Sequence, residues 1–231
     1  MHVAAAADPN YCESHGPEAA AVNIKASIAI ARRCAERDIP CVFTSSDLVF
    51  DGKNPPYREG DIVAPANKYG EQKATAEREM AATFGRTIIC RMPLMYGDAP
   101  PHAKSFIQPF IAALCSGKEL RLFTDEFRTP LSARDAAGGL LLALKKACPG
   151  VLHLGGPQRL SRFEMGELIA RALGIQAAIT PCLQRDVPMA APRAADVSLD
   201  SARAYALGFR PARMEEELAS LGCIRGSGAL H

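Results

Sequence analysis

Short apolar runs alternate along this chain with longer stretches of helical periodicity, and this alternation restricts the fold more than any other feature. Residues 41–46 form one such run, apolar at its start and rich in hydroxyl side chains at its end, and residues 87–91 and 151–154 form two more. Helical spacing of apolar residues predicts helices over 66–84 and 132–146. A strand, a helix of this length and a second strand make a βαβ unit with a right-handed crossover. The sequence therefore predicts an α/β fold with a parallel sheet.

The N-terminal part supplies a further strand and helix in this scheme. Residues 1–6 are interpreted as the end of a buried strand that stops at a turn over 8–10, and a helix is predicted from Pro17 to about residue 37. Asn23 lies beside the apolar stripe of that helix. One interpretation of Asn23 is a partly exposed polar residue or a satisfied buried amide. The other is a side chain or backbone hook that holds the active-site strand.

The second half of the chain has a different texture. After Gly155, short predicted helices are separated by Gly and Pro, and Ser161 with Glu164 forms a capping box at one helix start. Residues 181–193 are predicted to run irregularly over the surface. We expect a core over residues 1–150 and a small α+β lobe over 151–231, to which residues 96–123 also contribute.

Composition indicates an ordinary globular protein. The 231 residues are 48% hydrophobic and 23% charged, with a formal net charge of +2 and no basic run, so no nucleic-acid or membrane partner is expected. No apolar run approaches the roughly 20 residues of a membrane span. The eight cysteines are scattered, without CxxC or a zinc-type cluster, and are interpreted as reduced thiols. We expect no metal site and a cytoplasmic location.

Three residues around the first apolar run suit proton transfer to a carbonyl oxygen. Ser46 ends the predicted strand, and Tyr69 and Lys73 are four residues apart at the front of the next helix. That spacing places a phenol and an ammonium on one helix face. By itself the spacing is equally typical of an ordinary surface pair, so its context decides the interpretation.

Several longer stretches match a known family in the family's own order. The chain resembles the extended short-chain dehydrogenase/reductases, and most closely the dTDP-4-dehydrorhamnose reductase type. The matching stretches cover nearly the whole chain: Ser45-Ser46-Asp47-Leu48-Val49-Phe50-Asp51-Gly52, Pro56-Tyr57-Arg58-Glu59, Pro65-Ala66-Asn67-Lys68-Tyr69-Gly70-Glu71-Gln72-Lys73, Glu77, Tyr96-Gly97, Phe123-Thr124-Asp125-Glu126-Phe127-Arg128-Thr129-Pro130, His153-Leu154-Gly155-Gly156 and Asp196-Val197-Ser198-Leu199-Asp200. Leu48 departs from the Tyr that is usual in the rhamnose-forming reductases, which leaves the exact sugar open.

The resemblance implies a Rossmann-like fold and a catalytic triad. Ser46 would hydrogen-bond the substrate carbonyl, and Tyr69 would deliver a proton as hydride arrives from NADPH or NADH. Lys73 would hold the nicotinamide ribose, so Tyr69 and Lys73 also count as cofactor-binding residues. We expect the ammonium and the helix N-terminus to lower the pKa of Tyr69 from its ordinary value of about 10.

The same resemblance assigns further cofactor contacts. Ala4 and Ala5 would let the backbone lie close to the cofactor, and Met92 and Pro93 would contact the nicotinamide. Each alanine is equally well explained as part of a buried strand end.

The substrate would be a nucleotide-diphosphate sugar with a 4-keto group, contacted by Asp47 and Arg128. For Arg128 the alternative is a salt bridge with Asp125 or Glu126. His153 is interpreted as a satisfied core histidine.

The Gly-rich G-x-x-G-x-x-G loop that holds the cofactor pyrophosphate in this family is missing from the sequence. We expect an N-terminally truncated core with an exposed sheet edge and impaired cofactor binding. Three explanations would account for the missing loop: a gene-model error, a truncated inactive relative, or a domain completed by a partner. We favour the first. Whether this chain alone is an enzyme is left open.

The function predicted is NAD(P)-dependent reduction of a 4-keto nucleotide sugar, of the kind used in dTDP-rhamnose biosynthesis, with a homodimer as an allowed assembly. One alternative is a nucleotide-sugar epimerase or dehydratase. Another is a non-catalytic subunit similar to the regulatory subunit of methionine adenosyltransferase.

Overall fold

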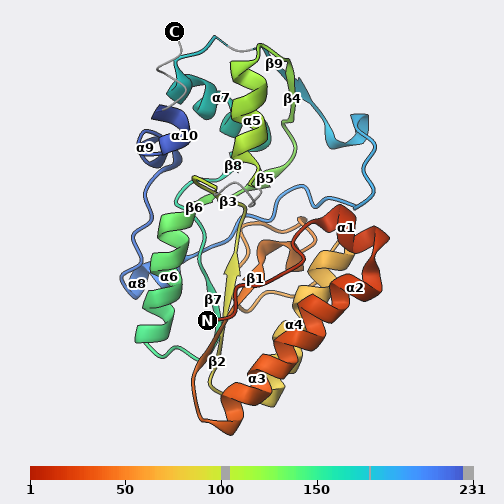
Figure 1. Ribbon diagram of the computed structural model, residues 1–231, viewed down its shortest axis with the longest axis vertical. Coiled ribbons are helices and arrows are strands. Elements are labelled where there is room, and N and C mark those ends of the chain that lie inside the picture. The colour runs from red at the N-terminus through yellow and green to blue at the C-terminus, as the bar shows by residue number, and fades with distance from the viewer. Residues whose placement is uncertain (100–104, 177, 226–231) are drawn as a thin grey trace.

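A parallel sheet covered by helices on both faces forms the centre of the molecule. The computed structural model describes residues 1–99, 105–176 and 178–225. The sheet has the order β1–β2–β7, from β1 (Cys41–Ser46), β2 (Thr87–Met92) and β7 (Gly150–His153). Both pairings are parallel. Helices α3 (Ser27–Glu36) and α4 (Lys68–Thr83) cover one face, and α6 (Ala133–Lys145) covers the other (Figure 1). The predicted α/β fold with a parallel sheet is confirmed.

Side chains along β1 point alternately to the two faces of the sheet, which explains why helices must cover both faces. Val42 points to the cluster that includes Leu140 of α6, whereas Cys41 and Phe43 point to the cluster that includes Met80 of α4. Successive side chains of a strand face opposite sides, so a strand that is apolar at every position is buried on both. The apolar start of this run is therefore buried on both faces of the sheet, although β1 stands at one end of the order β1–β2–β7.

The N-terminal segment runs beside β1 but is less regular than predicted. The strand expected over residues 1–6 is reduced to one parallel bridge between His2 and Phe43. Met1 and Val3 are each 62% exposed, so this side of the sheet is an open edge. The turn expected at 8–10 is the start of helix α1 (Pro9–Ser14), because the Asp8 carboxylate accepts a hydrogen bond from the Asn10 N–H.

The helix predicted over 17–37 is interrupted by a π-helical turn. It consists of α2 (Gly16–Ala20), the π-helix η1 (Ala21–Ala26) and α3. Asn23 lies within η1 and is fully buried; its Oδ1 accepts from Ala6 N–H at 2.9 Å and its Nδ2 donates to Ala6 O at 3.1 Å. The structure shows Asn23 as a satisfied buried amide, and the segment that it holds is the N-terminal one rather than the active-site strand β1.

A second apolar cluster lies beyond the carboxyl ends of the sheet strands, in the upper part of Figure 1. It joins α5 (Ile107–Cys115) to α7 (Arg162–Leu173), α9 (Met214–Leu218) and α10 (Gly222–Arg225). The capping box of Ser161 and Glu164 is present at the start of α7, and Gly174 ends this helix in the left-handed conformation.

Short strand pairs and turns complete the described elements. Residues predicted to be irregular from 181 onward include the end of β9, which pairs in parallel with β4. The remaining elements are β4 (Leu120–Phe123), β9 (Ile179–Cys182), β3 (Met95–Tyr96) with β6 (Leu131–Ser132), β5 (Phe127–Arg128) with β8 (Leu160–Ser161), the 3-10 turns η2 (Asp47–Val49) and η3 (Gln184–Asp186), and α8 (Ala202–Ala206).

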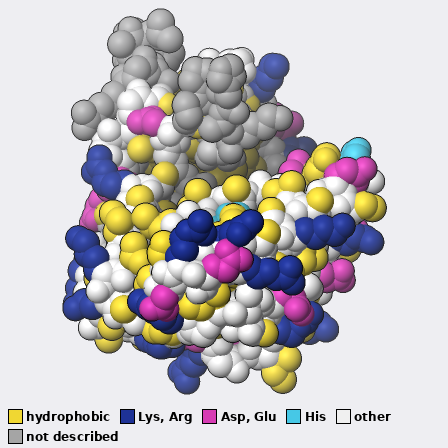
Figure 2. Space-filling view, turned by 60° about the horizontal axis from the view of Figure 1, so that its bottom comes forward, with side chains coloured by type: hydrophobic (Ala, Val, Ile, Leu, Met, Phe, Trp, Pro, Cys, Tyr) yellow, Lys and Arg dark blue, Asp and Glu magenta, His cyan; other side chains and the backbone are white. Residues whose placement is uncertain are grey.

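The surface mixes charged and apolar side chains. On the face seen in Figure 2, Lys and Arg lie interspersed with Asp and Glu, and hydrophobic side chains lie between them. Over the described residues, every helix is too short or too polar to cross a lipid bilayer. All eight cysteines are free thiols.

Candidate active site

The site forms where α4 approaches the carboxyl end of β1. Asn67 caps α4 by accepting a hydrogen bond from the Gly70 N–H at 3.0 Å. Gly70 allows the close approach, because a Cβ at this position would collide with the carbonyl oxygen of Leu48. The first turn of α4 is thereby held against the turn that follows Ser46, and Tyr69 lies in that first turn.

Ser46 and Tyr69 line a common cleft of about 280 Å³. The cleft lies between the end of the sheet and the second apolar cluster. Its remaining walls come from the N-terminal segment, the turn after β2, and a group of charged side chains: Ala7, Pro9, Asp47, Leu48, Pro93, Leu94, Met95, Glu126, Arg128, Arg162 and Arg193. This is the edge of a parallel sheet at which α/β proteins bind ligands.

The hydroxyl of Ser46 is oriented by its neighbours. It donates to Asp47 Oδ1 at 3.0 Å and accepts from the Leu48 N–H at 3.1 Å. Asp47 is itself buried, and its Oδ2 lies 3.6 Å from Arg128 Nε. Burial raises the pKa of Asp47 to about 6, and the Arg128 charge and the Ser46 hydrogen bond only partly offset that effect.

Tyr69 carries a proton at neutral pH. Burial and, to a smaller extent, the negative charge of Asp47 raise the pKa of its phenol above the ordinary value, while Ser46 lowers it. The expected lowering of this pKa was wrong, because the side chain is only 8% exposed and an acid lies nearby. In this state Tyr69 is a proton donor rather than a phenolate.

Lys73 lies one helical turn beyond Tyr69 and is 1% exposed. Its Nζ donates to Thr44 O at 2.9 Å and lies 4.6 Å from the ring centroid of Phe43 and 5.9 Å from that of Tyr69. Burial lowers the pKa of Lys73 to about 8, although Glu77 acts in the opposite direction. The structure therefore brings Ser46, Tyr69 and Lys73 together as predicted, with Lys73 outside the cleft wall.

The four other residues predicted to contact a cofactor occupy different environments. Pro93 lines the cleft, whereas Met92 is buried in the cluster beneath α6. Ala4 is exposed and Ala5 is half-buried, on the segment that Asn23 holds beside β1. Neither alanine lines the cleft, where Ala7 lies instead.

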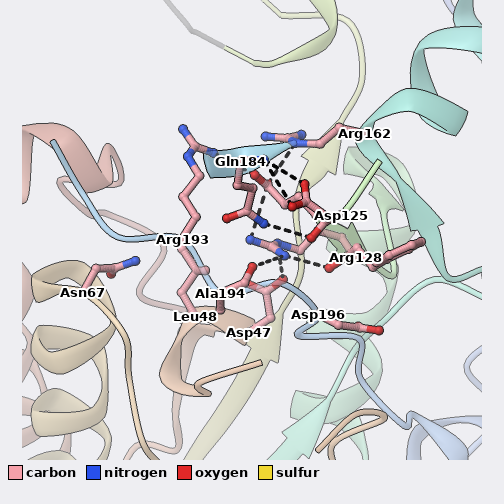
Figure 3. A network of polar contacts seen from close by, with 12 residues as sticks. Asp47, Leu48, Asn67, Asp125, Arg128, Arg162, Gln184, Arg193, Ala194 and Asp196 are labelled. Carbon is pink, nitrogen blue, oxygen red and sulfur yellow. Dashed lines mark hydrogen bonds and ion pairs between the residues drawn. The ribbon is translucent and has the colours of Figure 1, made fainter. Parts of the chain in front are cut away.

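Arg128 is fully engaged by the protein. It is 5% exposed, and its Nη1 donates to Phe127 O at 2.7 Å. Its Nη2 lies 3.4 Å from Glu126 Oε1, in addition to the contact with Asp47. The alternative interpretation of Arg128, a salt bridge with Glu126, is what the structure shows. Figure 3 shows Arg128 within the surrounding network of polar contacts, with Asp47 below it.

Two arginines of the cleft were missed by the sequence interpretation. Arg162 begins α7, and Arg193 lies in the extended segment after η3. Both pair with Glu126, at 3.0 Å and 3.3 Å. No local pattern marks them, since their common feature is a partner 36 and 67 residues away along the chain.

His153 is a core residue, as predicted. It is fully buried, and its Nδ1 lies 3.1 Å from Tyr57 O.

Comparison with known proteins identifies the family. The model of the RmlD substrate binding domain matches residues 1–222. The chain belongs to the RmlD substrate binding domain family. The predicted resemblance to dTDP-4-dehydrorhamnose reductases is thereby confirmed, and with it the Rossmann-like character of the fold.

Among curated relatives of this RmlD-family chain is the probable low-salt glycan biosynthesis reductase Agl14 of Haloferax volcanii. It is 31% identical over 229 residues, which are 96% of this chain and 75% of Agl14. Methionine adenosyltransferase 2 subunit beta of Bos taurus is 28% identical over 215 residues, 90% of this chain and 64% of that subunit. The chain thus spans about two thirds to three quarters of the length of these relatives.

Among solved structures, the dTDP-4-dehydrorhamnose reductase of Bacillus anthracis in complex with NADP has the same fold as this RmlD-family chain. The TM-score is 0.88 at 21% identity, and the match covers 95% of this chain and 77% of that enzyme.

Proposed function

We propose that this chain carries the proton-donating and sugar-binding part of an NAD(P)-dependent reductase that acts on a 4-keto nucleotide-diphosphate sugar. The observation that carries the proposal is the shared cleft of Ser46 and Tyr69, with Lys73 buried one turn along α4, in a chain of the RmlD family. The reductases among its relatives, Agl14 and the Bacillus anthracis enzyme, support the same class of reaction.

Proton delivery follows from the state of Tyr69. Because burial keeps the phenol protonated, Tyr69 holds its proton until the substrate oxygen becomes basic, and then transfers it to that oxygen. Ser46 lies beside the phenol and supplies a second hydroxyl for the same oxygen, once its hydrogen bond to Asp47 is exchanged for one to substrate. Lys73 has a pKa near 8 and can return a proton toward the site after each turnover.

A nicotinamide cofactor, NADPH or NADH, fits the groups next to the cleft. Lys73 donates one hydrogen bond to Thr44 O, and the other N–H groups of its ammonium can donate to a ribose hydroxyl. Tyr69 and Lys73 would hold the nicotinamide side, with Ala4, Ala5, Met92 and Pro93 as the proposed neighbours. When bound, the cofactor supplies the hydride. The sequence contains no G-x-x-G-x-x-G pattern, so we assign no residues to the pyrophosphate.

The proposal also covers the roles of the two parts of the chain and the location of the protein in the cell. Residues 1–150 would serve the cofactor side, and residues 151–231 with 96–123 would serve the sugar. Free thiols at all eight cysteines suit the reducing cytoplasm.

A non-catalytic binding subunit is the second candidate, and the methionine adenosyltransferase 2 subunit beta relatives favour it. Such a subunit would keep the cleft without using Tyr69 for chemistry.

Replacement of Tyr69 separates the two candidates. The purified chain is mixed with NADPH and a dTDP-4-keto-6-deoxy sugar, and loss of the nicotinamide absorbance is followed. We expect Tyr69→Phe to lower turnover by roughly 10²–10⁴-fold, because the proton donor is lost. Tyr205→Phe, on α8, is the matched control and keeps turnover. Turnover that is equal in Tyr69→Phe and the unchanged protein would reject the reductase. Absence of turnover although both NADPH and the sugar nucleotide bind would favour the binding subunit.

A further inference from the structure

Lys73 and Glu77 are four residues apart on α4, a spacing at which oppositely charged side chains of a helix are neighbours and can pair. Both side chains are buried, and the two residues are 1% and 5% exposed. Water screens their attraction little at such a position, which favours a direct ion pair. The structure shows a different arrangement. Lys73 Nζ donates to Thr44 O, and the Glu77 carboxylate is bound by a residue of β2.

That residue is Arg91, whose guanidinium contacts both oxygens of the Glu77 carboxylate. Its Nε donates to Oε1 at 3.0 Å and to Oε2 at 3.2 Å, and its Nη2 donates to Oε2 at 2.8 Å. Arg91 is 3% exposed. Charge-assisted hydrogen bonds of this paired kind fix the geometry of both groups. Glu77 is therefore directed to β2 instead of along its own helix.

Arg91 is held from its other side as well. Its Nη1 lies 3.4 Å from Glu59 O and 3.4 Å from His153 Nε2, and its Cζ lies 5.0 Å from the centroid of the Phe50 ring. These contacts come from β7 and from the turn and loop after β1. Arg91 is not part of the cleft wall, so any effect that it has on the site passes through Glu77.

Few titratable groups face Lys73. They are Tyr69 and Glu77 on α4, Cys12 on α1, and His2 beside β1. Burial lowers the pKa of Lys73 to about 8, and Glu77 opposes this more strongly than Cys12 does. Burial and the charge of Lys73 lower the pKa of His2, so this imidazole adds no positive charge at neutral pH. Glu77 is thus the carboxylate that could hold the ammonium of Lys73 in an ion pair.

We propose that Arg91 is a positioning residue: by pairing with Glu77, it keeps that carboxylate from pairing with Lys73, whose ammonium stays available on the cofactor side. The inference rests on the proposed function, because it explains how Lys73 stays free to hold the ribose. Without Arg91, the Glu77 carboxylate would be left buried and unpaired, which is unfavourable. Lys73, one turn earlier on α4, is the cation to which it would then turn.

The protonation of Lys73 tests this assignment without cofactor or turnover. The full chain is prepared with isotopically labelled lysine, and the NMR signal of Lys73 Cε, identified by its absence from Lys73→Met, is followed as pH is raised. We expect Arg91→Met to raise the pKa of Lys73 above about 8 by about 1–2 pH units, because Glu77 then pairs with the ammonium.

Two further variants show whether the effect passes through Glu77. In Arg91→Met/Glu77→Met the competing carboxylate is gone, so the pKa of Lys73 should return to about 8 or below. Replacement of both partners of a buried ion pair by apolar side chains is commonly tolerated, so this variant should fold. Arg78→Met removes an exposed arginine from the same helix, and as the matched control it should leave the pKa of Lys73 unchanged.

The outcomes are decisive in both directions. An equal pKa of Lys73 in Arg91→Met and the unchanged protein would overturn the assignment, and so would a rise that persists in the double variant. If Arg91→Met does not fold, Arg91→Lys keeps one charge but cannot contact both carboxylate oxygens through a planar fork. A smaller rise in the pKa of Lys73 is then expected, and no rise would overturn the assignment.

Kinetics separate this assignment from the proposed reaction. We expect Arg91→Met to raise the KM for NADPH by about 10- to 100-fold with a smaller change in kcat, because a charged hydrogen bond to the ribose is lost, and the double variant to recover it. An unchanged KM would overturn the positioning role. In a chain without turnover, the Kd for NADPH replaces the KM. Full turnover in Tyr69→Phe would reject the reductase, and the pKa of Lys73 in Arg91→Met would still decide whether Arg91 acts through Glu77.

Discussion

Asp47 connects the hydroxyl of Ser46 to the guanidinium of Arg128, and burial makes its ionisation costly. Burial raises its pKa from 3.8 to about 6, so between these pH values the folded protein holds a proton that the unfolded chain releases. The free energy of unfolding therefore falls as pH rises from about 4 to about 6, by up to about 1.4 kcal/mol per pH unit from this residue.

Asp47→Asn should remove this contribution. Urea unfolding at a series of pH values is expected to show a smaller fall in the free energy of unfolding over that window than in the unchanged protein. Asp38→Asn, at a side chain 76% exposed, is the control and should keep the original slope. Identical slopes in Asp47→Asn and the unchanged protein would show that Asp47 is already ionised below pH 4.

At the scale of elements, the approach of α4 to β1 depends on one glycine. A Cβ at Gly70 would collide with the Leu48 carbonyl oxygen and lie 2.8 Å from Pro65 Cβ, whereas a Cβ at Gly138 on α6 meets nothing within 4 Å. The same substitution is therefore expected to have opposite effects at the two helical positions.

Gly70→Ala should destabilise the fold by about 1–3 kcal/mol through overpacking, and should lower turnover because the first turn of α4 carries Tyr69. Gly138→Ala should stabilise it by up to about 1 kcal/mol, because alanine is the better helix former. Urea unfolding of the two variants checks this. Stabilisation by both would mean that α4 can retreat from Leu48 without cost.

At the scale of the whole molecule, Glu126 ties the sheet end to the rest of the structure. It pairs with Arg162 of α7 and Arg193 of the extended segment, and through Arg128 it is linked to Asp47 after β1. Removing one partner of a buried ion pair leaves the other charges unpaired, so Glu126→Gln is expected to cost about 3–5 kcal/mol.

Thermal and urea unfolding of Glu126→Gln measure that loss. Glu36→Gln breaks an exposed pair with Arg33 and should change stability by less than about 0.5 kcal/mol. Equal stability of the two variants would show that the buried cluster adds nothing to the fold.

Local signals determined much of this protein. The apolar run before Ser46, the spacing of Tyr69 and Lys73 and the capping box at Ser161 are each contained in a few neighbouring residues. Strand period, helix period and cap chemistry act over that range, so the sequence was sufficient for the parallel sheet and α7. The grouping of Ser46 with Tyr69 and Lys73 came from the family resemblance.

Tertiary structure decided the features that depend on distant partners. Only the folded chain shows that burial and Asp47 raise the pKa of Tyr69. The same holds for the ion pair between Arg128 and Glu126, and for the position of Arg162 and Arg193 in the wall of the cleft. Desolvation and ion pairing depend on what surrounds a group in space. No local pattern of residues encodes those surroundings, because the partners of Glu126 lie as far as 67 residues from it along the chain.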